Sequence, residues 1–218
     1  MTELRTEEEQ LDAIKSWWKD NGKSLVIMIA VAVSAVYGYK AWQNKQVTTS
    51  ENASVMYQQL IGAVVPDEEA DAEESIATAR HLAKTLKAEY SDSQYAKFAS
   101  LLMAKVAVNS GDLSTAQAEL DWLLATEPKA LLKSIALIRK AQILAEQKEF
   151  DQALGLLKSI TSNALQVQVA ELEGDIYLAQ GDKKQARAAY EKAIANKTAG
   201  SNQAVISMKL NDLSTEEG

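Results

Sequence analysis

The chain has 218 residues, a formal net charge of −7 and no cysteine. An acidic balance without a basic stripe interleaved with aromatic residues argues against nucleic acid as a partner. The missing cysteine excludes disulfides and thiolate metal sites, and the scarcity of helix breakers, with two prolines and nine glycines, predicts an all-α fold.

One apolar run dominates the N-terminal region. Residues 24–39 carry no charge, and Lys23 and Lys40 bracket them. As a helix this stretch rises about 26 Å, slightly less than the hydrocarbon core of a bilayer. Flanking lysines and the aromatic side chains of Trp17, Trp18 and Trp42 supply the remaining length. We interpret residues 24–42 as a single transmembrane helix, preceded by an N-terminal leader at 1–23.

Two other interpretations of the run stay open. Val36 and Gly38 are small or apolar enough to precede a signal-peptide cleavage site, although the acidic leader is unlike the short basic one of a signal peptide. A buried core helix would also be apolar, but it would not need tryptophan and lysine at both ends.

The distribution of basic residues predicts the orientation. Lys15, Lys19 and Lys23 precede the span, whereas no lysine or arginine follows Lys45 until Arg80. The positive-inside rule therefore places the N-terminus in the cytoplasm. In a bacterium, the rest of the chain would be periplasmic.

Residues 43–92 are expected to form connecting helices. Apolar residues recur at helical spacing from Val47 to Val64, so the membrane helix either continues or restarts as an amphipathic helix that ends before Pro66. A second helix runs from Ile76 to Leu86. The acidic segment at 67–74 leads into it and suits a helix N-terminus electrostatically.

Repeats decide the fold class over residues 93–200. Small and apolar residues recur with the spacing of the tetratricopeptide helix pair, which predicts three repeats in a helical solenoid. The three registers are Ala104, Ala107, Gly111, Ala116, Leu120 and Leu123; Ala141, Leu144, Lys148, Ala153, Leu157 and Ile160; and Gly174, Tyr177, Gly181, Ala186, Tyr190 and Ala193. The second unit lacks a glycine at its turn. Residues 201–218 are expected to form a capping helix and tail that cover the last repeat.

The sequence predicts no catalytic, metal or cofactor site. The single histidine, His81, has no ligand set near it, and the serines and carboxylates form no nucleophile elbow, phosphate loop or paired-acid motif. We therefore expect a protein that is not an enzyme and needs no cofactor.

A helical solenoid offers a concave face for binding protein, and the inner-helix positions predict its members. This face grades from apolar to acidic, and each apolar position could equally be plain core. The candidate residues are Phe98, Leu101, Leu102, Lys105, Val108, Asn109, Ile135, Ile138, Arg139, Gln142, Glu146, Gln168, Glu171 and Asp175.

The motifs also resemble a known family. The segments that carry the resemblance are an acidic leader, Trp-Trp-Lys-Asp-Asn-Gly-Lys at 17–23, Tyr-Lys-Ala-Trp at 39–42, the turn at 181–187 and Met-Lys-Leu-Asn-Asp-Leu at 208–213. In these segments the chain resembles YfgM-type ancillary SecYEG translocon subunits of Gram-negative bacteria. The resemblance implies a single-pass protein of the inner membrane with a periplasmic repeat domain. It also implies two partners, the SecYEG translocon and a membrane-anchored periplasmic chaperone of the prolyl isomerase type.

The resulting hypothesis is a membrane-tethered interaction module that helps pass unfolded, translocating polypeptides to periplasmic chaperones. Anchoring in inner-membrane lipid would raise the effective concentration of the concave face near the channel exit. Two alternatives remain: a regulatory anchor that sequesters a signalling protein, and a purely structural subunit of a membrane complex.

Overall fold

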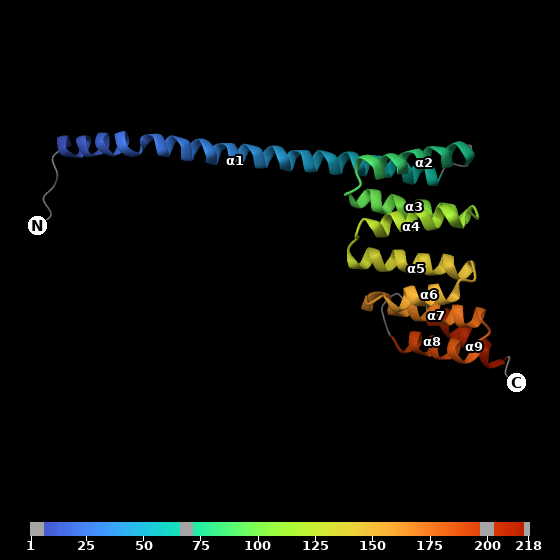
Figure 1. The fold of residues 1–218 in the computed structure, drawn as a ribbon. Helices are drawn as coiled ribbons and strands as arrows, with labels where there is room; N and C mark the ends of the chain where they lie inside the picture. Colours follow the sequence, from blue (N-terminus) through green and yellow to red (C-terminus); the bar gives the residue numbers. More distant parts are fainter. Residues whose placement is uncertain (1–6, 66–71, 197–202, 216–218) are drawn as a thin grey trace, which may run out of the picture. The chain divides into compact units, whose positions relative to one another are not determined.

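The computed structural model describes residues 7–65, 72–196 and 203–215, and all its regular elements in these ranges are helices. The predicted all-α class is thereby confirmed (Figure 1). The chain divides between Asn52 and Ala53 into two units, which are described separately. The helices are α1 (Glu7–Val64), α2 (Ala72–Glu89), α3 (Gln94–Asn109), α4 (Leu113–Ala125), α5 (Ala130–Glu146), α6 (Phe150–Lys158), α7 (Gln166–Ala179), α8 (Lys183–Ala195) and α9 (Gln203–Thr215), with a 3-10 turn at Asn163–Leu165.

The first unit contains most of α1. Among the described residues, α1 is the one helix long and apolar enough to cross a membrane, and none of its most apolar window is buried. Ile27, Val31 and Tyr37 are exposed, which argues against a core helix. The helix is continuous through Val36 and Gly38, and it extends past residue 42 without a break.

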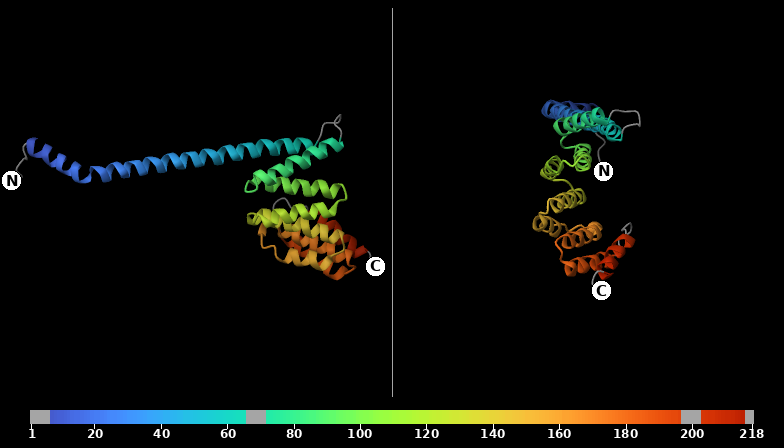
Figure 2. Two further views of the ribbon diagram at one scale, coloured as in Figure 1. Left: turned by 45° about the horizontal axis from the view of Figure 1, so that its top comes forward. Right: turned by 90° about the vertical axis from the view of Figure 1, so that its right-hand side faces the viewer.

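The second unit begins with the last turns of α1 and continues through α9. Its buried side chains form four clusters, each of which joins consecutive helices: α1, α2 and α3; α3, α4 and α5; α5, α6 and α7; and α7, α8 and α9. This succession is the packing of a solenoid, in which each unit contacts only its neighbours. Figures 1 and 2 show the helices from α2 to α8 stacked in chain order.

The turns within the three helix pairs α3/α4, α5/α6 and α7/α8 match the predicted register. Gly111, Lys148 and Gly181 have φ values of 75°, 63° and 82°. Glycine adopts this left-handed conformation without strain, and Lys148 adopts it at the equivalent position although it carries a side chain. The next residue in the first and third turns is an aspartate. Asp112 and Asp182 cap the following helices by accepting hydrogen bonds from backbone N–H groups.

The third repeat shows why its inner helix needs a small residue. A Cβ atom added at Gly174 would lie 2.4 Å from the ring of Tyr190, which is fully buried. The ring of Tyr190 therefore packs directly on the backbone of α7. Ala186, expected at the closest approach of the same helix pair, is also fully buried.

Parts of four predicted segments lie outside the described residues: 1–6 of the leader, 67–71 of the acidic lead-in to α2, 197–200 of the repeat region, and 201, 202 and 216–218 of the C-terminal segment. The acidic lead-in to α2 is described from residue 72 onward, and Glu73 and Glu74 lie in the first turn of that helix. The predicted C-terminal cap is described as α9, whose Ile206 and Leu213 are buried against α7 and α8.

Candidate functional site

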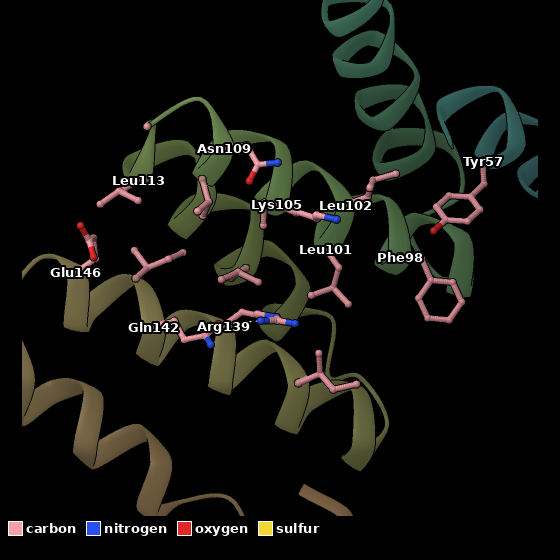
Figure 3. Close-up of a pocket in the computed structure, with 16 residues that line it drawn as sticks. Tyr57, Phe98, Leu101, Leu102, Lys105, Asn109, Leu113, Arg139, Gln142 and Glu146 are labelled. Carbon is pink, nitrogen blue, oxygen red and sulfur yellow. Dashed lines mark hydrogen bonds between the residues drawn. The ribbon is translucent and has the colours of Figure 1, made fainter. Parts of the chain in front are cut away.

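A cavity of about 1000 Å³ lies on the inner helices of the first two repeats. Helices α3 and α5 form its two long walls, and α4, the turn between α3 and α4, and the C-terminal end of α1 contribute the remaining residues (Figure 3). Ten candidate concave-face residues line it: Phe98, Leu101, Leu102, Lys105, Val108, Asn109, Ile135, Arg139, Gln142 and Glu146.

The chemical character of the cavity changes along its length. The rings of Tyr57 and Phe98 lie at one end, with their centroids 6.2 Å apart. Lys105 and Arg139 face the middle from α3 and α5, and Glu146 lies at the opposite end (Figure 3). The cavity thus has an aromatic end, a cationic middle and an acidic end.

Its apolar side chains are accessible to solvent. The exposed fractions of Phe98 and Val108 are 39% and 43%, although both lie on a helix whose opposite face is core. Leu101 and Leu102 are half-buried, because they also pack against the core clusters. Exposed apolar surface in a concave position is the usual property of a site that binds protein.

Ile138 corrects the sequence prediction. Its place in α5 is equivalent to that of Leu101 in α3, but it is only 8% exposed and does not line the cavity. It packs instead with Leu157, Leu172 and Ile176 of α6 and α7. Ile138 is therefore a core residue and not part of the concave binding face.

The three candidate residues on α7 also lie outside this cavity. Gln168 is exposed, whereas Glu171 and Asp175 bind a lysine of α9. The ammonium group of Lys209 donates to Glu171 Oε1 at 2.9 Å and to the two carboxylate oxygens of Asp175 at 2.8 and 2.9 Å. The hydroxyl of Tyr190 donates to Asp175 Oδ1 at 2.7 Å. The acidic end of the predicted face is thus occupied by the chain itself.

This network changes the protonation of its members. Burial raises the pKa of Tyr190, and its hydrogen bond to Asp175 raises that pKa further. Burial lowers the pKa of Lys209, but the hydrogen bonds to Asp175 and Glu171 outweigh this effect and leave the pKa raised. Near neutral pH, the tyrosine is therefore neutral and the lysine is charged.

Several lining residues were not predicted from the sequence. Tyr57 comes from α1, far from the repeats in the chain, and its only signal was the helical spacing of apolar residues around it. Leu113 and Leu120 come from outer helix α4, whereas the prediction considered inner helices alone. The remaining unpredicted residues are Ala104, Gly111 and Ile143.

A second cavity of about 430 Å³ lies on α2, α3 and α4. Lys87 and Glu119 line it and form an ion pair at 2.5 Å, and the hydroxyl of Ser100 donates to both the backbone oxygen and the carboxylate of Glu119. These polar groups form hydrogen bonds and an ion pair with one another. This cavity therefore leaves fewer polar groups available to bind a partner than the first cavity does.

Comparison with known proteins agrees with the repeat architecture. Residues 15–215 match a family model described as a tetratricopeptide repeat-like domain. The chain is 32% identical to a protein of Haemophilus influenzae, 33% identical to one of Aggregatibacter actinomycetemcomitans and 31% identical to one of Escherichia coli, with 95% of this chain and 97% of each relative covered. Each of these relatives is named an ancillary SecYEG translocon subunit. No solved structure matches.

Proposed function

Because the chain belongs to the family of tetratricopeptide repeat-like ancillary SecYEG translocon subunits, we propose that it is a membrane-tethered interaction subunit of the SecYEG translocon. In this role it passes translocated polypeptides to periplasmic chaperones, including a membrane-anchored one of the prolyl isomerase type. It binds and positions other proteins and performs no chemistry of its own.

The observation that carries this proposal is the cavity between α3 and α5. Its exposed apolar residues, such as Phe98 and Val108, suit the apolar side chains that an unfolded chain exposes. The apolar stretch of α1 supports the tether. A tether confines the cavity to the membrane surface, and weak contacts become occupied because the local concentration of emerging chains is high.

We propose that the N-terminal leader is cytoplasmic and the repeat domain periplasmic in the inner membrane. The three lysines that precede the apolar run, against two that follow it closely, support this orientation. The cavity then lies on the side of the membrane where translocated chains emerge.

An anchor exchange tests the proposal against a regulatory anchor and a purely structural subunit. In one chimera, residues 1–42 are replaced by an unrelated single-pass anchor of the same orientation. A second protein keeps the native anchor and carries Phe98→Ser with Val108→Ser, two exposed positions that spare the core. Pulse-labelled translocating polypeptides are then isolated with each protein.

We expect the chimera to keep binding these polypeptides and the double variant to lose most of this binding. The opposite result, with binding lost in the chimera and kept in the double variant, would assign the function to the leader or the span. A circular dichroism melt of the double variant serves as the control for folding.

A further inference from the structure

Three residues occupy the same place in the inner helices of the three repeats: Lys105, Gln142 and Asp175. Each lies six positions before the turn residue with a positive φ that follows its helix. The repeat geometry therefore presents these side chains in equivalent directions, although their charges differ. The contact that one of these side chains makes therefore indicates which contacts the other two can make.

The third repeat shows what occupies this place. Lys209 of α9 pairs with Asp175 and also reaches Glu171, one helical turn earlier. Ile206 and Leu213 of the same helix are buried on the adjoining apolar surface. Helix α9 packs on α7 and α8 as α5 packs on α3 and α4, and it neutralises this place with one opposite charge that lies beside large apolar side chains.

The first repeat carries the opposite charge at the equivalent place. Lys105 is exposed and forms no ion pair with any described residue. Arg139 faces the same cavity from α5 and donates to the amide oxygen of Gln142 at 2.9 Å, so its positive charge is not neutralised there. The middle of the cavity is therefore positively charged, although the chain as a whole has a net charge of −7.

Resting on the proposed function, we propose that this cavity selects a partner segment in which a carboxylate is flanked by large apolar side chains. The carboxylate lies between Lys105 and Arg139, and an apolar side chain on one side of it packs against Phe98 and Tyr57. Glu146 repels a second carboxylate at the far end of the cavity, so the acidic residue is held at the middle.

The dimensions set the length of the segment. From Phe98 to Asn109, α3 rises roughly 16 Å, a distance that about five extended residues span. A labelled peptide of about eight residues therefore covers the cavity with its ends outside. The probes are three such peptides that are identical except for a central Asp, Asn or Lys, with a leucine two positions before it and another two positions after it, because residues two apart in an extended chain share a face.

Binding of these peptides is measured by fluorescence anisotropy on the full-length protein in detergent micelles. We expect the Asp peptide to bind about tenfold more tightly than the Asn peptide, as for a charge-assisted hydrogen bond, and the Lys peptide to bind most weakly. Because the preference is electrostatic and partly exposed to solvent, it should shrink as salt is raised.

Charge reversal supplies the decisive comparison. Lys105→Glu should abolish the preference for the Asp peptide and improve binding of the Lys peptide. Lys133→Glu, an exposed position of α5 that does not line the cavity, changes the net charge equally and should leave the preference intact.

Equal binding of the three peptides, absence of binding, or an unchanged preference in Lys105→Glu would overturn the inference. Self-association of the protein through this face, detected by analytical ultracentrifugation, would overturn it as well. The inference can fail while the proposed function stands: if translocating chains are isolated with the protein but the peptides show no preference for Asp, the cavity binds clients without selecting an acidic residue.

Discussion

The ammonium group of Lys209 contacts both carboxylate oxygens of Asp175, at 2.8 and 2.9 Å, and so joins α9 to α7 across 34 positions of the chain. The same carboxylate accepts a hydrogen bond from the hydroxyl of Tyr190 in α8. One acidic residue thus ties three helices together. The acidic end of the predicted binding face is consequently a structural contact that closes the array.

Removing the charge of Lys209 should loosen α9. We expect Lys209→Met to lower the free energy of unfolding by on the order of 1 to 2 kcal/mol, because Asp175 and Glu171 lose a charged partner that is partly shielded from water. Limited proteolysis should then cut within α9 sooner than in the parent. Cleavage at an unchanged rate would show that apolar contacts alone hold the helix.

The same contact predicts a dependence on alkaline pH. The folded-state pKa values of Tyr190 and Lys209 exceed their usual values of 10.0 and 10.5. Between the unfolded and folded values the folded chain holds protons that the unfolded chain has released, so stability is fully present below about pH 10 and falls above it. Melting temperatures recorded from about pH 8 to 11 test this. The fall should be shallower in a variant with Tyr190→Phe and Lys209→Met, and equal slopes would contradict the assignment.

Two glycines should respond to alanine with opposite signs. Gly174→Ala places a Cβ atom against the buried ring of Tyr190 and should cost on the order of 1 to 3 kcal/mol. Gly155→Ala, in α6 with nothing within 4 Å of the added atom, should stabilise by roughly 0.5 to 1 kcal/mol through helix propensity. Denaturant melts of the full chain in detergent measure both changes. Similar effects of the two substitutions would refute the close packing of α7 on α8.

Most of the fold could be predicted from the sequence because the repeat places residues with steric roles at fixed intervals. Gly111 and Gly181 marked two turns, and the register placed the third at Lys148 despite its missing glycine. The ten cavity residues on α3 and α5 followed from the same register.

Other parts of the site depend on tertiary contacts that spacing does not encode. Ile138 and Leu101 share a register position, but the packing of α6 and α7 buries only Ile138. Lys209 reaches Asp175 from a helix outside the repeats, and Tyr57 reaches the cavity from α1. No local sequence pattern identifies the two residues that each of these contacts joins.

The proposed topology predicts the result of a protease experiment. Protease added to spheroplasts should digest the repeat domain and leave an N-terminal fragment protected, because the lysines before the apolar run favour a cytoplasmic leader. A tag at each terminus identifies the fragments. Digestion only after the inner membrane is permeabilised would reverse the orientation and remove the basis for a periplasmic role.

Site-specific photocrosslinking in living cells tests directly whether the cavity between α3 and α5 binds other proteins. A photoreactive residue is placed at Val108, which is exposed inside the cavity, and in a matched protein at Lys158, which is exposed on α6 outside it. We expect the residue at position 108 to trap translocating polypeptides or a periplasmic chaperone, and the residue at position 158 to trap few or none. Equal crosslinking at the two positions, or crosslinking at Lys158 alone, would contradict the assignment of the cavity as the binding site.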